Sequence, residues 1–331
     1  MTVPHGSRTP GDRYVCDSIG AVEPTGDPGR RRFRIDAGDI CRNRDCTLSC
    51  AMSYTPTAAD IESYQARGYW IGPKLVEDDR IDQLRRALER IFTGDFDGDG
   101  YSYRNQYPDL PQQEMFAVRK LMNGWWINDA VRDMVCNPVL GRIAAALMQA
   151  DSARLWHDQV VLKPGAGSQE TELGNIGWHQ DYAYWNCTTT SNMTTAWLAL
   201  QDTDLSNGGM RTIVGSHQWG FVEEAATFTE PDLDGLRDRY IDRTGGEWID
   251  EPCVLQAGQV SFHHALCFHG SGANRTTAPR MSVIGHYMPG DCGFRANGCY
   301  HSNVGLLGPR PRDGQPYDND YFPVVYPAPG S

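Results

Sequence analysis

The sequence predicts a mainly β protein with flanking helices, in which a helical layer packs outside a β-sandwich or barrel. Helix-like patterns occupy the chain before about residue 150, whereas short β-prone runs alternate with Gly, Pro, Asn and Asp from Leu155 onward. Several short strands at such spacing are typical of a sandwich or barrel. With 331 residues, 40% of them hydrophobic, the chain is long enough to bury a sizeable core.

The helical part contains three segments with recognisable ends. Thr57 opens a capping-box pattern, and Gly68 lies where that helix should end. A second helix is expected over about residues 77–93, because apolar residues recur there at the spacing of one buried stripe. A third helix is expected after Asn137 and Pro138, a pair that suits the N-cap and the first helical turn.

The β part contains five short runs with strand-forming composition, namely LWHDQVVLK, TTAWLALQD, MRTIVG, QVSFHHALCF and RMSVIGHYM. Residues 1–50 show no sustained periodicity and are rich in Gly, Pro, Arg and Asp. We therefore expect them to form a poorly ordered or loosely docked leader. The remaining residues, 51–331, are expected to form one domain.

Charge and the lack of targeting signals argue against several classes of protein. The chain has 30 basic and 42 acidic side chains, a net charge of −12, which argues against a general nucleic-acid binder. It contains no apolar run long enough to span a bilayer and no secretory signal at its N-terminus. Ten cysteines without a disulfide-scaffold spacing are consistent with reduced thiols. We expect a cytoplasmic protein that acts on a small molecule.

The stretch WHQDYAYW, residues 178–185, carries the first candidate site. Residues i and i+2 of a strand point to the same face, so His179 and Asp181 would project together. One imidazole and one carboxylate are two of the three ligands of the 2-His-1-carboxylate triad that holds non-haem Fe(II). The pair alone is a weak signal, because such pairs often arise by chance. A third ligand would come from a distant strand, and the candidates are His263, His264 and His269.

The stretch PRMSVIGHYM carries the second candidate site. Alternation along a strand places Arg280, Ser282, Ile284 and His286 on one face. A charged arginine in an otherwise β-prone strand is costly to bury unpaired, so it would suit a carboxylate ligand bound in bidentate geometry, with Ser282 assisting. The alternative is an exposed arginine on an edge strand.

Several motifs occur in an order that resembles the phytanoyl-CoA hydroxylase-like (PhyH) family of Fe(II)- and 2-oxoglutarate-dependent dioxygenases. They are Lys163-Pro164, WHQD, Trp197, Asn207-Gly208-Gly209, Gly215-Ser216-His217 and HGSGANRTTAPR. The resemblance covers roughly residues 54–288. The 11-residue step from His269 to Arg280 matches the family's spacing, and this match selects His269 over His263 and His264.

The resemblance implies a fold, a ligand set and a co-substrate site. The fold would be a double-stranded β-helix, the cupin-type jelly roll, flanked by helices. The implied iron ligands are His179, Asp181 and His269. The implied 2-oxoglutarate site centres on Arg280 with Ser282 beside it, and its further candidates are Lys163, Gln159 and Thr195. Three aromatic residues after the ligand pair would either line a substrate pocket or belong to the barrel core, namely Tyr182, Tyr184 and Trp185.

The resemblance also implies an activity. Fe(II), 2-oxoglutarate and O2, with ascorbate as reductant in vitro, would support hydroxylation of an unactivated C–H bond with release of succinate and CO2. Halogenating relatives replace the carboxylate ligand by Ala or Gly, so the presence of Asp181 favours hydroxylation. Desaturation, epoxidation and ring closure are open alternatives within the same chemistry.

Other function classes and the substrate remain open from the sequence. A cupin-type hydrolase or isomerase with zinc or manganese would use the same three ligands without Arg280 or Lys163. A catalytically silent binding protein would not need an intact triad. No adenine- or phosphate-binding loop specifically supports an acyl-CoA substrate, so we expect a small molecule of specialised, natural-product metabolism. The oligomeric state is not predicted.

Overall fold

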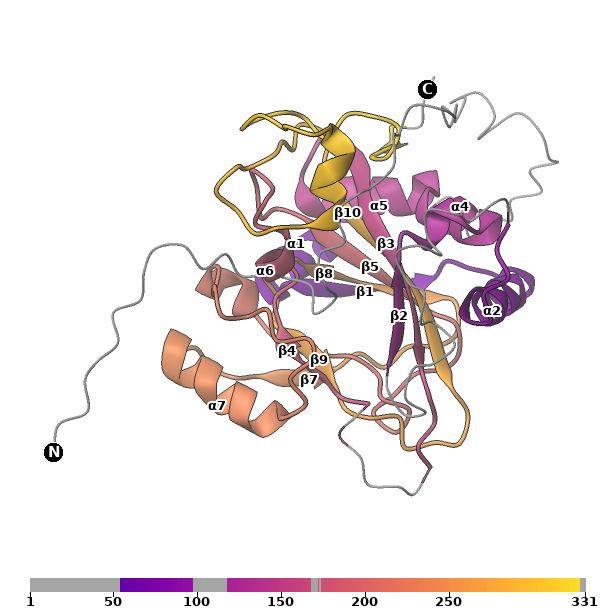
Figure 1. The fold of residues 1–331 in the computed structure, drawn as a ribbon. Coiled ribbons are helices and arrows are strands. Elements are labelled where there is room, and N and C mark those ends of the chain that lie inside the picture. Colours follow the sequence, from indigo (N-terminus) through magenta and orange to yellow (C-terminus); the bar gives the residue numbers. More distant parts are fainter. Residues whose placement is uncertain (1–53, 98–117, 168–171, 173, 328–331) are drawn as a thin grey trace, which may run out of the picture.

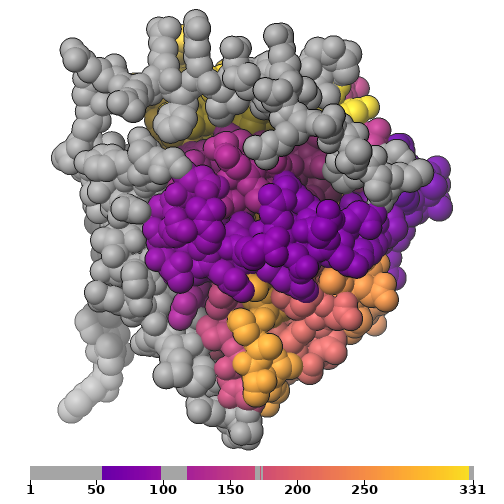
Figure 2. Space-filling view, turned by 90° about the vertical axis from the view of Figure 1, so that its right-hand side faces the viewer, coloured from indigo at the N-terminus to yellow at the C-terminus, as the bar shows by residue number. Residues whose placement is uncertain are grey.

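The computed structural model describes residues 54–97, 118–167, 172 and 174–327 (Figure 1). The expected leader, residues 1–50, lies outside the described residues. Figure 2 shows residues 54–97 as an indigo band across one face, with later parts of the chain above and below it. None of the helices among the described residues combines the length and apolar character that a membrane crossing requires.

The described strands form two antiparallel sheets. The larger has the order β1-β8-β5-β10-β3-β11, with β2 also paired to β3, and the smaller has the order β4-β9-β6-β7. Their bounds are β1 Tyr69–Lys74, β2 Arg119–Met122, β3 Ala153–Lys163, β4 Ile176–His179, β5 Thr194–Ala199, β6 Arg211–Ile213, β7 Asp250–Pro252, β8 Gln259–His264, β9 His269–Ser271, β10 Arg280–Pro289 and β11 Val324–Tyr326. From β3 to β10 the chain passes repeatedly between the two sheets. This arrangement confirms the predicted double-stranded β-helix.

Strand β10 is the centre of the larger sheet. All ten of its residues are buried, because β3 and β5 pair on its two sides. Arg280 lies opposite Lys163 in β3, at the start of β10. Near the other end, His286 lies opposite both His157 of β3 and Thr195 of β5. Residues two apart on β10 share a face, so Arg280 and His286 face the same side of the sheet.

Helices cover the outer face of the larger sheet. Their bounds are α1 Ala58–Arg67, α2 Asp78–Phe92, α4 Asp129–Val135 and α5 Pro138–Met148, with a 3₁₀ turn η3 at Gly124–Trp126. Their apolar side chains join those of the strands in one cluster, in which Leu88 and Ile143 lie with Val160 and Phe262. Burying this apolar surface is the main stabilising contribution to such a layer.

All three helices predicted from the sequence are confirmed to within one or two residues. The hydroxyl of Thr57 accepts a hydrogen bond from the backbone N–H of Asp60, and Gly68 ends α1 with a φ of 80°. Asn137 accepts a hydrogen bond from the N–H of Val139 at the start of α5. Because capping residues form hydrogen bonds with nearby backbone groups, helix ends can be predicted from the sequence without knowledge of the fold.

The sequence analysis did not predict α4 or two further helices. The two further helices are α6 Tyr182–Trp185, which follows β4 directly, and α7 Leu233–Thr244, which packs beside the smaller sheet (Figure 1). The contact of α7 is made by Leu236 and Tyr240 against Trp178 and Phe268. Short 3₁₀ turns occur at η4 Ser216–Trp219 and η5 Ser302–Leu307.

Candidate metal centre and active site

A cavity of about 480 Å³ lies between the two sheets. Strands of both sheets line it, and so do the segment around α6 and the loop that contains Phe228. Of the sequence-predicted site residues, the cavity lining includes His179, Asp181, His269, Arg280, Gln159, Thr195, Tyr184 and Trp185. The double-stranded β-helix therefore gathers residues that are more than a hundred positions apart in the sequence, such as Gln159 and Arg280.

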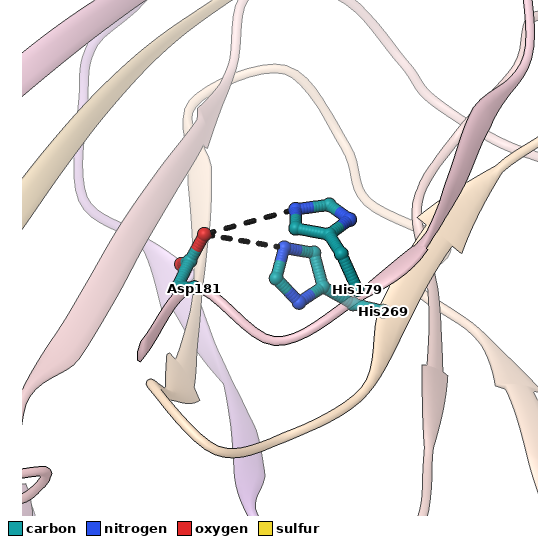
Figure 3. A group of neighbouring side chains, drawn as sticks. All are labelled: His179, Asp181 and His269. Atoms are coloured by element: carbon teal, nitrogen blue, oxygen red, sulfur yellow. Dashed lines mark ion pairs between the residues drawn. The ribbon is translucent and has the colours of Figure 1, made fainter. Parts of the chain in front are cut away.

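His179, Asp181 and His269 form the candidate metal centre (Figure 3). His179 at the end of β4 pairs in register with His269 at the start of β9. The Nε2 atoms of the two histidines lie 3.7 Å and 3.8 Å from Oδ1 of Asp181. One ligand atom from each residue lies within 4.8 Å of the others. Among the described residues this is the cluster of His, Cys, Asp and Glu side chains that could hold a metal ion.

The structure corrects the local interpretation of Asp181. Strand β4 ends at His179, and Asp181 has the helical dihedral angles φ −55° and ψ −38° as the residue that precedes α6. The same-face argument for a strand is therefore wrong for Asp181, although its side chain does lie next to that of His179. Gln180 holds the intervening turn, since its Nε2 donates to the carbonyl oxygens of Gly220 and Leu266.

Backbone carbonyls orient both imidazoles. Nδ1 of His179 lies 2.7 Å from the carbonyl oxygen of Gly177, and Nδ1 of His269 lies 3.0 Å from that of Cys267. A carbonyl can only accept, so each Nδ1 carries the proton and each Nε2 keeps a lone pair for a metal. Burial lowers the pKa of both histidines, which favours the neutral, metal-binding form.

The carboxylate is held in its ionised form. Burial alone would raise the pKa of Asp181, but His269 and the hydrogen bond from His263 hold it well below its usual range. Oδ2 accepts hydrogen bonds from Thr195 Oγ1 at 2.7 Å and from His263 Nε2 at 3.2 Å. Two neutral imidazoles and one carboxylate on one side of a cavity fit a divalent iron ion with open coordination positions.

Arg280 places a guanidinium in the same cavity, with its Cζ 5.1 Å from the centroid of the Trp197 ring. Only 2% of the residue is exposed, and its Nε and Nη1 have no hydrogen-bond partner among the described residues. Burial lowers its pKa to about 10. The alternative of an exposed edge arginine is wrong, because β10 is the buried central strand. Buried N–H groups without hydrogen-bond partners are costly, and a bound carboxylate would reduce that cost.

The other candidate co-substrate residues lie around Arg280 in different ways. Gln159 lines the cavity, whereas the hydroxyl of Ser282 is fully buried and has no partner among the described residues. The ammonium of Lys163 is also buried and donates to Ser271 Oγ and to the carbonyl oxygen of Gly272, both at 2.6 Å. Burial, and then the positive charge of Arg280, lower the pKa of Lys163.

The three aromatic residues after the ligand pair separate into two groups. Tyr184 and Trp185 line the cavity. Tyr182 packs in a buried cluster, with its ring against Phe221 and its hydroxyl donating to the carbonyl oxygen of Thr188 at 3.2 Å. The helical turn α6 separates Tyr182 from Tyr184, because side chains two positions apart on a helix point in different directions. Trp185, three positions after Tyr182, belongs to the same buried cluster as Tyr182 and also lines the cavity.

Several cavity residues were not singled out by the sequence analysis. They are Lys120, His157, Phe228, Ser271 and His301, while His263 was considered as a third ligand and His286 was noted without a role. Nζ of Lys120 lies 3.9 Å from the centroid of the Phe228 ring, which in turn packs edge-on against His179 at 5.3 Å. Alternation along β3 from Gln159 would have indicated His157. No local pattern marks Lys120 or His301, because separate segments bring them to the cavity.

The sequence of this chain is similar to that of a known protein family. The sequence model of the family described as phytanoyl-CoA dioxygenase (PhyH) matches residues 64–282, well over half of the chain. The chain belongs to the PhyH family. Its family is one of Fe/2-oxoglutarate-type dioxygenases, which confirms the resemblance inferred from the motifs.

Two curated relatives illustrate the match of this PhyH-family chain. Ectoine dioxygenase of Streptomyces avermitilis is 25% identical over 250 residues, which cover 69% of this chain and 77% of the relative. Peroxisomal phytanoyl-CoA dioxygenase of Rattus norvegicus is 23% identical over 242 residues, which cover 70% of this chain and 68% of the relative.

Solved structures resemble the PhyH-family chain in fold. The non-heme alpha ketoglutarate dependent carbocyclase SnoK from nogalamycin biosynthesis has a TM-score of 0.62 and 22% identity, covering 83% of this chain and 98% of SnoK. The epimerase SnoN in complex with Fe3+, alpha ketoglutarate and nogalamycin RO has a TM-score of 0.60 and 20% identity, covering 81% of this chain and 97% of SnoN. Both likenesses support the double-stranded β-helix.

Proposed function

We propose that this PhyH-family protein is an Fe(II)- and 2-oxoglutarate-dependent oxygenase that hydroxylates an unactivated C–H bond of a small molecule. One observation carries the proposal: a single cavity contains both a convergent set of two imidazoles and one carboxylate and a buried guanidinium whose Nε and Nη1 have no hydrogen-bond partner among the described residues. The first set suits Fe(II), and the second suits the carboxylate of a keto acid.

In this proposal His179, Asp181 and His269 hold the iron through Nε2, Oδ1 and Nε2. The backbone carbonyls of Gly177 and Cys267 keep both rings in the orientation that binding requires. When bound, iron and 2-oxoglutarate supply the oxidative chemistry that side chains lack, with succinate and CO2 as by-products. The protein's task is to position the reactants and to keep the cavity dry.

Arg280 binds the distal carboxylate of 2-oxoglutarate in this proposal. Lys163 lies opposite Arg280 in the neighbouring strand, and its Nζ contacts Oγ of Ser271, a residue of the cavity lining, so it is proposed to support the co-substrate site. Gln159 and Ser282 lie on the same two strands and are proposed as further polar contacts. The complexes of SnoN with Fe3+ and alpha ketoglutarate, and of EctD from S. alaskensis with 2-oxoglutarate and 5-hydroxyectoine, support such a site in this fold.

The primary substrate is proposed to bind on the side of the cavity lined by Tyr184 and Trp185. Phe228 lies close to these residues, because its backbone N–H donates to the hydroxyl of Tyr184 at 2.9 Å. Aromatic walls of this kind exclude water and hold an organic ligand at low cost in conformational entropy. Tyr182 would then support this wall from the core rather than contact the substrate.

Hydroxylation in natural-product metabolism is the proposed reaction, and related outcomes have specific support. The presence of Asp181 favours hydroxylation over halogenation. The fold is also similar to those of a carbocyclase and an epimerase from nogalamycin biosynthesis, so ring closure or epimerisation is the second candidate. A cupin-type hydrolase or isomerase that does not use 2-oxoglutarate would leave the N–H groups at Nε and Nη1 of Arg280 without a ligand to bind.

One experiment tests the proposal. The purified protein is loaded anaerobically with Fe(II), 2-oxoglutarate is added, and the visible charge-transfer absorption of the complex is recorded. Oxygen, ascorbate and a panel of small natural products are then supplied, and succinate is measured. We expect 2-oxoglutarate binding and substrate-dependent succinate. Absence of both the absorption and succinate would contradict the proposal.

A further inference from the structure

The two oxygens of Asp181 have different surroundings. Oδ1 faces Nε2 of His179 and of His269, whereas Oδ2 accepts hydrogen bonds from Thr195 and His263. We infer that Thr195 is a positioning residue that, together with His263, holds Oδ2 so that Oδ1 alone is presented to the metal. This inference rests on the proposed function, because it concerns the ion that the site would hold.

The direction of the hydrogen bonds around Thr195 follows from counting protons. A threonine hydroxyl carries one proton, and an ionised carboxylate can only accept. Thr195 Oγ1 therefore donates to Asp181 at 2.7 Å, and its oxygen accepts from Nδ1 of His286 at 2.8 Å. The chain of donors runs from His286 through Thr195 to Asp181.

The donors lie on three adjacent strands of the larger sheet. Thr195 of β5 lies opposite His263 of β8 on one side and opposite His286 of β10 on the other. These three side chains form one row across adjacent strands, and each residue is at most 2% exposed. The His286 ring is further fixed by Trp185 and His157, with ring centroids 4.6 Å and 4.3 Å away.

Asp181 needs this support more than the two histidines do. His179 and His269 belong to paired strands, and each ring is oriented by a carbonyl two residues before it in sequence. Asp181 instead follows the end of β4 and precedes α6, so no strand pairing fixes its backbone. The hydrogen bonds from Thr195 and His263 anchor the Asp181 carboxylate, which lies in a turn, to the larger sheet.

The same contacts distinguish this role from a direct contact of Thr195 with 2-oxoglutarate. The only hydroxyl proton of Thr195 is already donated to Asp181, so a co-substrate oxygen would have to break that bond to gain one. Removal of the hydroxyl should therefore weaken metal binding first. Partners that orient metal ligands commonly contribute about 10- to 100-fold in metal affinity.

The test uses the full chain without metal and titrates it with Co(II), a redox-stable substitute for Fe(II), while the d–d absorption is recorded. Thr195→Val removes the hydroxyl at nearly constant volume, and Thr195→Ser retains it. We expect the Co(II) dissociation constant of Thr195→Val to rise about 10- to 100-fold with an altered d–d spectrum. Thr195→Ser should stay near the wild-type value and spectrum.

Thr194→Val is the matched control for the loss of a buried hydroxyl. Thr194 is the neighbouring residue on β5, is fully buried, and contacts the Tyr64 hydroxyl and the His263 carbonyl oxygen on the opposite face of the sheet. It should lose thermal stability comparable to that lost by Thr195→Val while keeping wild-type Co(II) affinity. Equal weakening of Co(II) binding in both valine variants would overturn the inference in favour of a general loss of structure.

Other outcomes distinguish failure of this inference from failure of the proposed function. If Thr195→Val binds Co(II) like wild type but binds 2-oxoglutarate more weakly once loaded with metal, Thr195 is a co-substrate contact and the positioning role is wrong. If the wild-type protein itself binds no Co(II) at this site, the proposed function fails and the inference fails with it. Wild-type Co(II) binding that is unchanged in Thr195→Val defeats only the inference.

Discussion

Asp181 and Arg280 are both buried charged residues of the cavity, and they differ in the hydrogen bonds that the protein makes to them. Asp181 accepts two hydrogen bonds at Oδ2, whereas Nε and Nη1 of Arg280 have no partner among the described residues. A carboxylate that is already anchored can bind a metal ion without rearrangement. An unpaired guanidinium, in contrast, gains most when an anionic ligand arrives.

Substitution of Asp181 by alanine should abolish hydroxylation. The change removes the only carboxylate among the three converging groups, and two imidazoles alone bind a divalent ion less tightly. Succinate formation in the presence of Fe(II) and 2-oxoglutarate measures the effect, and a thermal melt of the metal-free variant checks that it folds. Wild-type turnover by this variant would remove Asp181 from the ligand set.

Substitution of Arg280 by glutamine should raise the KM for 2-oxoglutarate by roughly 10- to 100-fold, because hydrogen bonds to charged groups contribute about 1.5–3 kcal/mol. Co(II) affinity should be unchanged. Arg154 provides the control, since its guanidinium lies on β3 and donates to the backbone oxygens of Gly290 and Phe322. An unchanged KM in Arg280→Gln, or an equal rise in Arg154→Gln, would speak against a co-substrate role for Arg280.

At the scale of elements, β3 has a different character on its two faces. Toward the cavity it carries Gln159 and His157. Toward the helices it carries Asp158, whose Oδ1 accepts a hydrogen bond from the backbone N–H of Trp125 at 3.2 Å. Asp158 is fully buried, and burial raises its pKa to about 7. Strand β3 therefore carries a titratable carboxyl group on the face that packs against the helices and polar side chains on the face that lines the cavity.

The raised pKa of Asp158 predicts a pH-dependent stability. The folded state binds the proton more tightly than the unfolded chain, so this contribution is present at low pH and is lost as pH rises toward about 7. The nearby Cys136 and Tyr287 have raised pKa values and stay neutral over this range. Each unit of pKa difference corresponds to about 1.4 kcal/mol in the free energy of unfolding.

Asp158→Asn keeps an oxygen for the Trp125 N–H and does not titrate. Compared with wild type, its free energy of unfolding should improve progressively between pH 4 and pH 7, by a few kcal/mol at most, and then remain constant. Urea unfolding at several pH values measures the difference. A difference between variant and wild type that is independent of pH would show that Asp158 does not titrate in this range.

At the scale of the whole molecule, the cavity couples ligand binding to stability. Its walls come from both sheets, so a metal and a co-substrate bound there should stabilise only the folded state. Saturating Co(II) and then 2-oxoglutarate should each raise Tm, with about 2.7 kcal/mol of stabilisation at 100 times the Kd. Arg280→Gln should keep the increase from Co(II) and lose most of that from 2-oxoglutarate. An equal rise in Tm on addition of 2-oxoglutarate in the wild-type protein and in Arg280→Gln would contradict this account.

The sequence by itself determined the local features of this protein. The three predicted helices have ends that depend on capping residues such as Thr57 and Asn137, whose hydrogen bonds lie within three positions along the chain. The motifs also indicated the family, the type of fold and the three candidate ligands. These signals are readable because each depends on residue identity and spacing over a short stretch.

The tertiary structure decided what depends on contacts between distant segments. It placed Asp181 in a turn rather than on a strand, directed Tyr182 to the core, and brought Thr195, His263 and His286 into one row beside the candidate metal centre. It also added Lys120 and His301 to the cavity. These features follow from the register of strands that are far apart in the chain, and no local pattern specifies that register.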